Sequence, residues 1–255
     1  MVSGFRLGTT SYIYPADIIT NARKLAGRMS DIELVIFESD EYGNYLDSQT
    51  VDELCLLGAE HNMTYTVHLP LDLCLADKNP KLEEALRVIR NTARLSPHGY
   101  VIHLDGRVQS SSQGFNRWLD NSLGSLHILV EETGNPDLIC VENLKNQYPE
   151  MLDCVLDRMP VAACVDVGHL WTQNPNPVPL LEKWLPRARV VHLHGVGERD
   201  HQRLSLVTPG QLDPVTKLLS TSFNGVVTFE IFNESDLLDS MDAFAASLKR
   251  SQPID

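Results

Sequence analysis

Short runs of β-branched and other apolar residues alternate with longer segments of helical period along the chain. This alternation predicts βα units and a parallel sheet. The runs that predict strands span residues 5–11, 32–39, 64–70, 99–105, 138–144, 161–170, 189–195 and 225–232. The segments that predict helices span residues 16–27, 48–61, 80–94, 113–132, 148–158, 177–185, 209–220 and 235–249. Each predicted strand is thus followed by a predicted helix.

The number of these units indicates how the sheet closes. Eight strands, each followed by a helix and joined by right-handed crossovers, make up a closed (β/α)8 TIM barrel. In the predicted helix at 80–94, Leu82, Leu86 and Ile89 share one face, as expected of a helix that packs on a barrel. The chain shows no internal repeat, and the Pro-rich stretch 173–179 predicts a loop. We expect a single barrel domain over residues 1–255.

The composition fits one large core and narrows the choice of partners. With 255 residues, 43% of them hydrophobic, the chain is long enough for one barrel of this type. The 34 acidic and 21 basic residues give a formal charge of -13, which opposes strong binding to nucleic acid or an anionic membrane. No leader-like N-terminus and no run of about 18 apolar residues occurs. We expect a cytoplasmic protein that acts on a small molecule.

The five cysteines are odd in number and show no CxxC spacing. Two of them, Cys140 and Cys164, lie in predicted core strands. Buried free thiols in a reducing compartment are therefore expected rather than disulfides.

Polar residues interrupt the apolar strands near their carboxyl ends. In a barrel of this kind those ends converge on one mouth, where catalytic groups gather. The third to eighth predicted strands end in His68, His103, Glu142, Asp166 with His169, His192 with His194, and Glu230. Asp200 and His201 follow in the loop after the seventh strand, and the second strand ends near Glu38 and Asp40. The sequence thus concentrates titratable side chains at one mouth.

The residue types in this set indicate a metal centre. A single histidine at a strand end is usually a hydrogen-bonded structural residue. Histidine and carboxylate together, over six consecutive strands, form the mixed nitrogen and oxygen donor set that binds Zn²⁺, Mn²⁺ or Fe²⁺. A buried carboxylate such as Glu142 is costly without a cation or a hydrogen-bond network. Because cysteine is absent from the set, we expect an open catalytic site rather than a structural zinc site.

Strand parity predicts how neighbouring donors in the stretch CVDVGHLW are arranged. Asp166 is expected to point into the mouth while the strand is still regular. Gly168 is expected to let the chain turn, so that His169 enters from a loop. The two donors are then expected to serve different ions.

The seventh strand offers two histidines of the same parity, His192 and His194. We favour His192 as the metal ligand. His194 is expected to contact substrate or to support the ligands.

A resemblance that covers essentially the whole chain is carried by VHLP, VIHLDG, CVENL, CVDVGHLW, VVHLHG, RDH and FEIF. In this order they resemble the xylose-isomerase-like TIM barrels, which include endonuclease IV type enzymes and sugar-phosphate isomerases and epimerases. The resemblance implies two or three divalent ions, Zn²⁺ or Mn²⁺, with Glu142 bridging two of them. The ligands that it implies are His68, His103, Glu142, Asp166, His169, His192, Asp200, His201 and Glu230. The endonuclease loop separates its acid and histidine by one residue, whereas Asp200 and His201 are adjacent, which leaves open whether both bind metal.

The N-terminal runs RLGTTSYIYPADIITNARKLAG and IELVIFESDEYGNYLD most resemble the bacterial cobamide-remodelling phosphodiesterases. The resemblance implies hydrolysis of the nucleotide-loop phosphodiester of a cobamide, a vitamin B12 type cofactor, to cobinamide phosphate and a riboside. Glu142, which could orient or deprotonate the attacking water, and Glu230 are the predicted catalytic residues. The residues predicted to bind substrate are Tyr12, Tyr14, Glu38 and His194. The tyrosine rings could pack against a large planar ligand.

Three alternatives remain beside this function. The resemblance implies that a sugar (phosphate) isomerase or epimerase holds one ion through the donors of strands five to eight. Such an enzyme does not need three further imidazoles in ligand positions, so His68, His103 and His169 favour multi-metal hydrolysis. An apurinic endonuclease would use the same ligands but needs a broad cationic surface, which a chain of charge -13 does not favour. A barrel that only binds a cobamide or a sugar phosphate would not need metal.

Overall fold

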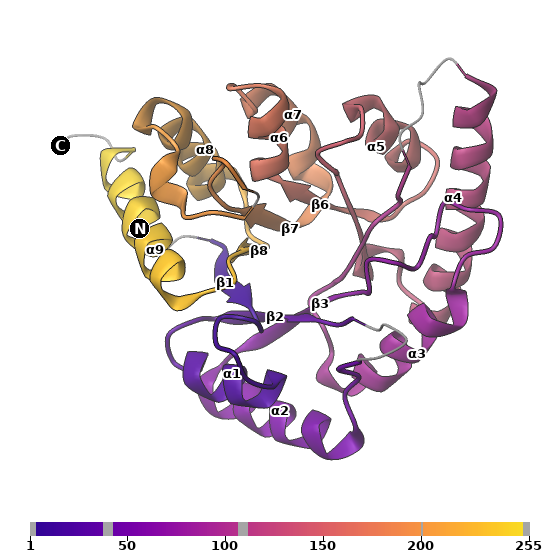
Figure 1. Cartoon of the computed structure of the whole chain (residues 1–255), viewed down its shortest axis with the longest axis horizontal. Coiled ribbons are helices and arrows are strands. Elements are labelled where there is room, and N and C mark those ends of the chain that lie inside the picture. Colours follow the sequence, from indigo (N-terminus) through magenta and orange to yellow (C-terminus); the bar gives the residue numbers. More distant parts are fainter. Residues whose placement is uncertain (1–3, 38–42, 107–111, 200, 252–255) are drawn as a thin grey trace.

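The computed structural model describes residues 4–37, 43–106, 112–199 and 201–251, and the strands within them form one closed barrel (Figure 1). The strands pair in parallel and in chain order, and β8 pairs with β1 to close the ring. The strands are β1 (Arg6–Thr10), β2 (Asp31–Val35), β3 (Thr64–His68), β4 (Tyr100–Ile102), β5 (Ile139–Glu142), β6 (Ala162–Asp166), β7 (Ala188–Leu193) and β8 (Val226–Phe229). The predicted (β/α)8 barrel is confirmed.

Helices surround the barrel (Figure 1). The α-helices are α1 (Ile18–Leu25), α2 (Ser48–His61), α3 (Leu82–Thr92), α4 (Gln113–Thr133), α5 (Pro149–Leu156), α6 (Val167–Gln173), α7 (Val178–Trp184), α8 (Pro209–Ser222) and α9 (Glu234–Arg250). Short 3-10 helices span Ala93–Leu95, Pro136–Leu138, Leu185–Arg187 and Leu204–Leu206. The side chains of Asp17, Asp47, Ser112 and Asn233 accept a backbone hydrogen bond three residues further on and thereby cap α1, α2, α4 and α9.

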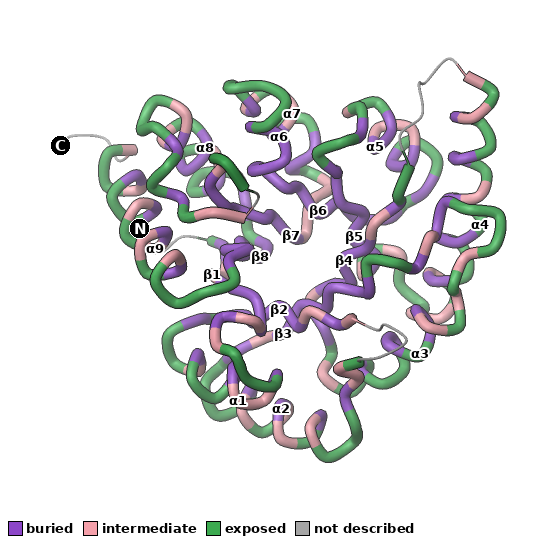
Figure 2. Tube along the Cα trace, in the orientation of Figure 1, coloured by how far each residue is buried: buried purple, intermediate pink, exposed green. Residues whose placement is uncertain are grey.

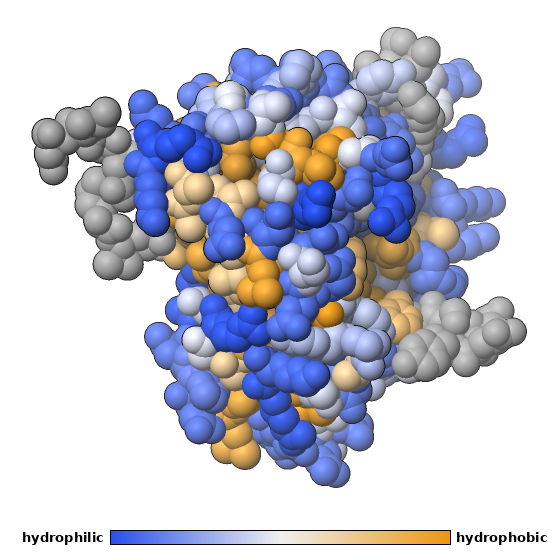
Figure 3. Space-filling model, turned by 60° about the vertical axis from the view of Figure 1, so that its left-hand side comes forward, coloured by the Kyte–Doolittle hydropathy of each residue, from blue (hydrophilic) through white to orange (hydrophobic). Residues whose placement is uncertain are grey.

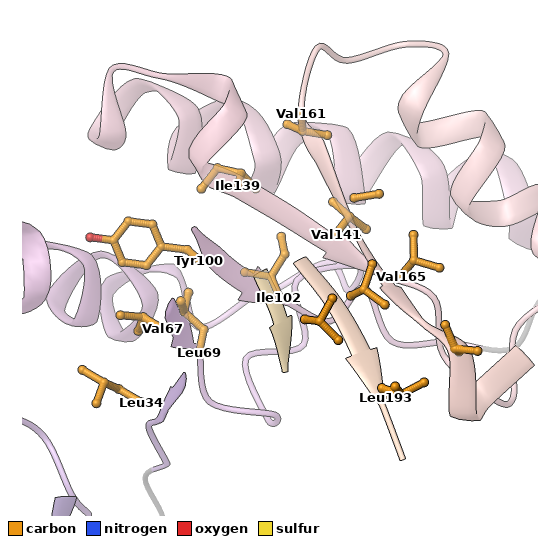
Figure 4. Packing of buried hydrophobic residues seen from close by; sticks show 14 of the residues in the cluster. Leu34, Val67, Leu69, Tyr100, Ile102, Ile139, Val141, Val161, Val165 and Leu193 are labelled. Carbon is orange, nitrogen blue, oxygen red and sulfur yellow. The ribbon is translucent and has the colours of Figure 1, made fainter. Parts of the chain in front are cut away.

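Alternate residues of each strand face opposite sides of the barrel wall. The residues that face the helices belong to one large apolar core, which includes Leu34, Val67, Ile102, Val141 and Val165 (Figure 4). The residues of opposite parity form a smaller cluster inside the barrel, made of Val101, Cys140, Ala162, Cys164 and Val190. Figure 2 shows the strands as buried and much of the outer helical layer as exposed. The barrel interior is therefore a packed core that ends below the mouth.

The side of the molecule in Figure 3 is largely hydrophilic, with hydrophobic residues in small separate groups. No helix in the described residues is long and apolar enough to cross a membrane. All five cysteines are free, and Cys140 and Cys164 are buried, as predicted.

The sixth strand ends earlier than the sequence pattern predicts. β6 stops at Asp166, and α6 follows at once where a strand was expected to continue to residue 170. The cause is local, because Oδ1 of Asp166 accepts a hydrogen bond from the backbone N–H of His169 at 2.6 Å and caps the first turn. His169 therefore enters the mouth from a helix, not from a loop. Gly168 is needed for space rather than for a turn, since a Cβ atom there would overlap the ring of His194.

Candidate metal centre

The carboxyl ends of the strands open into a cavity of about 270 Å³. Strand parity directs side chains into it, because Glu142 stands two residues beyond the interior residue Cys140, and Asp166 stands two beyond Cys164. The titratable residues that line the cavity include His68, His103, Glu142, His169, His201 and Glu230. Apolar residues complete its wall at Leu71, Leu144 and Phe232, which we call the apolar lip.

Three overlapping sets of histidine and carboxylate side chains could each hold a metal ion, because the donor atoms of each set lie within 4.8 Å of one another. The first group is His68, His103 and Glu142. The second group is Glu142, Asp166, His192 and Glu230. The third group is Asp166, His169, His194 and His201. Since Glu142 joins the first group to the second and Asp166 joins the second to the third, the groups form one continuous centre.

In the first group both imidazoles converge on one carboxylate oxygen. Oε2 of Glu142 lies 3.0 Å from Nε2 of His103 and 3.4 Å from Nε2 of His68. The other nitrogen of His68, Nδ1, donates to the carbonyl oxygen of Leu69 at 2.8 Å. This hydrogen bond fixes the orientation of the ring and leaves Nε2 as the nitrogen that faces Glu142.

In the second group one imidazole faces three carboxylates. Nδ1 of His192 lies 3.2 Å from Oε2 of Glu230 and 3.8 Å from Oε2 of Glu142. Oδ2 of Asp166 is 3.9 Å from the same nitrogen. All four side chains are buried. Carboxylates gathered this closely away from water repel one another unless cationic charge lies among them.

In the third group three imidazoles gather near Asp166. Nε2 of His194 lies 3.3 Å from Oδ1 of Asp166, and Nδ1 of His169 lies 3.4 Å from Oδ2. The ring centroids of His194 and His201 are 4.4 Å apart. An isolated bridge between Gly195 and Gln202 folds the loop so that His201 returns to the mouth.

Cys164 lies beside the second group, near Glu142 and His192. Burial raises the pKa of its thiol well above the usual range. Cys164 also belongs to the apolar cluster inside the barrel, below the carboxylates of the mouth. We therefore describe the centre by its nitrogen and oxygen donors.

The buried groups of the centre shift one another's pKa values. Burial opposes ionisation of Glu142, but the histidines around it, His103 foremost, outweigh this and hold the pKa of Glu142 well below its usual range. Burial also opposes charge on the imidazoles, but Glu142 raises the pKa of His68 to about 9, and Asp166 with Glu142 raises that of His169 to about 10. Binding of a divalent ion must therefore release protons.

Several buried atoms of the second group have no hydrogen-bond partner within the described residues. They are Nδ1 of His192, Oδ2 of Asp166 and Oε2 of Glu230. Unsatisfied buried polar atoms are costly, and these three belong to one set of converging donors. A cation that accepts both nitrogen and oxygen ligands, such as Zn²⁺ or Mn²⁺, would satisfy them together, so the residues fit the expected metal.

The structure brings most of the predicted ligands together. Those found in the three groups are His68, His103, Glu142, Asp166, His169, His192, His201 and Glu230. Asp200, and also Glu38 and Asp40 beyond the second strand, lie outside the described residues. His194, which we expected to contact substrate or support ligands, is fully buried and belongs to the third group.

Tyr12 and Tyr14 are not among the described residues that line the cavity. The ring centroid of Tyr12 lies 5.4 Å from that of Phe37. The hydroxyl of Tyr14 donates to Oε1 of Glu234 at 2.7 Å and accepts from Arg28 at 3.0 Å, which ties the segment before α1 to the start of α9. Contact of either tyrosine with substrate stays a prediction.

Two features of the mouth were missed by the sequence analysis. Glu33 on β2 is fully buried and contacts His192. Its signal is that β2 carries two acidic residues of inward parity, Asp31 and Glu33, in a strand that is otherwise apolar. The apolar lip was also missed, although Leu71 and Phe232 are 59% and 43% exposed at the cavity. All three lip residues lie two or three positions after the end of a strand, and this position is the signal that could have identified them.

Comparisons with known proteins agree on the fold. No protein-family model and no curated protein matches the sequence. A D-tagatose 3-epimerase-like protein matches with a TM-score of 0.79 and 22% identity over 97% of this chain and 98% of that chain. Endonuclease IV from Thermus thermophilus matches with a TM-score of 0.70 and 16% identity over 96% of this chain and 99% of that chain. L-ribulose 3-epimerase matches with a TM-score of 0.69 and 13% identity over 97% of this chain and 95% of that chain. The chain has the fold of these xylose-isomerase-like TIM barrels.

Proposed function

We propose that this protein is a metal-dependent phosphodiesterase that hydrolyses the nucleotide-loop phosphodiester of cobamides to cobinamide phosphate and a riboside. We infer the reaction class from the set of three donor groups joined through Glu142 and Asp166. The resemblance of the N-terminal segments to cobamide-remodelling phosphodiesterases supports the substrate class, and so does the apolar lip.

The three groups offer more donors than a one-metal reaction needs. The second group alone could hold the single ion expected of a sugar isomerase or epimerase. The first group adds His68 and His103, and the third adds three further imidazoles. Two or three divalent ions, when bound, supply charge neutralisation for a phosphate, activation of water and stabilisation of the leaving oxygen. This supports hydrolysis of a phosphodiester.

Individual side chains suit separate tasks in this reaction. Glu142 belongs to both the first and the second group, and we assign to its carboxylate the tasks of orienting the attacking water and accepting its proton. Glu230 holds the opposite side of the second group, beside His192. Lys145 lines the cavity and adds positive charge for a substrate phosphate. Because His194 is fully buried, we assign it to the third group as a ligand.

The residues that line the cavity favour a large, partly apolar substrate. Leu71 and Phe232 expose apolar surface beside the metal centre, where a planar ring system could rest. Duplex DNA would instead need a broad cationic surface. The chain has a formal charge of -13, and Lys145 is the only lysine or arginine among the described residues that line the cavity.

A second candidate is a metal-dependent isomerase or epimerase of a sugar or sugar phosphate. The second group contains the two glutamates, Glu142 and Glu230, that could move a proton between adjacent carbons. The D-tagatose 3-epimerase-like protein also has the highest TM-score of the three structures compared above.

The test is incubation of the protein with adenosylcobalamin, with a panel of sugar phosphates and with an abasic duplex, each with Mn²⁺ or Zn²⁺, followed by mass spectrometry. We expect cobinamide phosphate and a riboside from the first reaction. Interconversion of a sugar phosphate with intact adenosylcobalamin would favour the second candidate. As a control, chelator treatment should abolish the hydrolysis and added metal should restore it; hydrolysis that survives chelation contradicts the proposed metal dependence.

A further inference from the structure

Glu33 makes a buried contact across the inside of the barrel. It lies in β2, and its carboxylate Oε2 is 2.8 Å from Nε2 of His192 in β7. Both side chains are fully buried. Since β2 and β7 are not neighbours in the barrel order, the contact spans the interior rather than following the sheet.

This contact decides which nitrogen of His192 faces the metal centre. The hydrogen bond engages Nε2, so Nδ1 is the nitrogen that points to the carboxylates of the second group, with Glu230 nearest at 3.2 Å. A histidine that binds a metal through one nitrogen commonly donates its other N–H to a carboxylate, which fixes the ring and makes the ligand more basic. The geometry around His192 has this form.

Barrel stability does not account for the contact. A buried carboxylate loses its hydration, and replacing a buried ion pair by apolar side chains is often neutral or stabilising. Oε1 of Glu33 also has no hydrogen-bond partner within the described residues, which adds to the cost. A side chain that is costly for folding and aimed at one imidazole is better explained by what it does to that imidazole.

We propose that Glu33 is a positioning residue, which acts through His192 to hold Nδ1 towards the ion of the second group and to strengthen its binding. The inference rests on the metal centre of the proposed function but not on its substrate. Glu33 itself is not among the described residues that line the cavity.

Asp31 provides a matched control on the same strand. It faces the same way as Glu33 and is equally buried, but its carboxylate accepts a hydrogen bond from the hydroxyl of Thr64 at 2.6 Å. Asp31→Asn therefore removes a buried carboxylate from the barrel interior while the contact between Glu33 and His192 stays intact.

The experiment is a Co²⁺ titration of the metal-stripped full chain, followed through the visible absorption of the bound ion. The readout is the absorption band that His192→Ala removes, and thermal unfolding checks that each variant is folded. Glu33→Gln is expected to weaken binding of this ion about 10- to 100-fold. Glu33→Leu, which removes the acceptor and the charge, is expected to weaken it at least as much, and Asp31→Asn should bind as the wild type does.

A double variant tests whether Glu33 acts through His192. Because His192→Ala removes the absorption band, this comparison measures bound Co²⁺ by equilibrium dialysis. Glu33→Gln combined with His192→Ala should bind Co²⁺ no more weakly than His192→Ala alone. The proposal would be overturned if both Glu33 variants bound Co²⁺ with wild-type affinity, or if the wild-type chain bound no Co²⁺. It would also be overturned if the double variant lost as much affinity as the two single variants lose together. If the titrations behave as expected while adenosylcobalamin stays intact, the substrate assignment fails and the role of Glu33 stands.

Discussion

The first and third groups of the candidate metal centre use the same residue types but are built differently. The first group takes His68 and Glu142 from the last positions of β3 and β5, and His103 from the position after β4. These three strands are adjacent in the barrel. The register pairs His68 with Val101, two residues before His103. The donors of the first group therefore come from the carboxyl ends of neighbouring strands, without a contribution from a helix or a long loop.

The third group depends on segments outside the sheet. Asp166 ends β6, but His169 comes from the first turn of α6. His201 follows a loop and has a left-handed backbone with φ of 52°. A metal site made by a helix turn and a loop can deform more easily than one made by neighbouring strands.

The two groups carry the same number of carboxylates. The first group sets two imidazoles around Glu142, the third sets three imidazoles around Asp166, and the second group shares both carboxylates. The difference between the groups therefore lies in the segments that carry their donors. Because a helix turn and a loop carry donors of the third group, we expect its ion to be the more weakly held one.

The largest effect is expected for Glu142→Gln, because Glu142 serves both the first and the second group. Turnover should fall about 10²- to 10⁴-fold, since the variant loses a ligand charge and the proton acceptor for the attacking water. Hydrolysis of adenosylcobalamin and metal content per chain measure the change. The control is His61→Gln at the exposed end of α2, which should be normal in both. Undiminished hydrolysis by Glu142→Gln would exclude the proposed mechanism.

A smaller effect is expected for His201→Ala, which removes a donor from the third group and a contact with Glu230 but no donor of the other two groups. The most weakly held ion should bind about 10- to 100-fold more weakly, while the ions of the other groups are retained. Elemental analysis after dialysis at graded chelator concentrations measures this. Loss of all ions together would show that the third group is not separable from the rest.

Gly168→Ala tests the third group through packing. The added methyl group would overlap the ring of His194, so we expect a loss of about 1–3 kcal/mol in the free energy of unfolding and weaker binding of the same ion. The matched control is Gly124→Ala in α4, where a Cβ atom meets open space and a gain of about 0.5–1 kcal/mol is expected. Denaturant titration measures both. Equal stability of the two variants would mean that His194 has room to move.

The stability of the metal-free protein is expected to depend on pH. The carboxylates of Glu142 and Asp166 raise the folded-state pKa values of His68 and His194 to about 9 and that of His169 to about 10, above the ordinary 6.5. A raised pKa stabilises the folded chain fully below the unfolded value, and this contribution is lost as the pH rises through the folded value. The melting temperature of chelated protein should therefore fall between about pH 7 and 10.

Metal-loaded protein is the reference for this measurement. Its histidines have already released their protons to bind the ions, so its melting temperature should depend less on pH over the same range. A metal-free protein that becomes more stable from pH 7 to 10 would contradict the assignment of the shifted histidines.

The sequence predicted the strands of this molecule more completely than the connections between them. Strands and helices were recovered because apolar periodicity is a local signal. Glu142 was found because it ends an apolar strand. The start of α6 was not predicted, because the apolar run continues past Asp166 and hides a cap that depends on one side-chain hydrogen bond.

The sequence by itself determined the barrel and which of its donors face the mouth, because a period of two residues in parallel strands fixes which side chains face inward. The tertiary structure alone decided the partners of those donors. Glu33 meets His192 across 159 positions of the chain, and His194 fits against Gly168 only because β7 lies beside β6. Such contacts arise when the ring closes, and no local pattern encodes them.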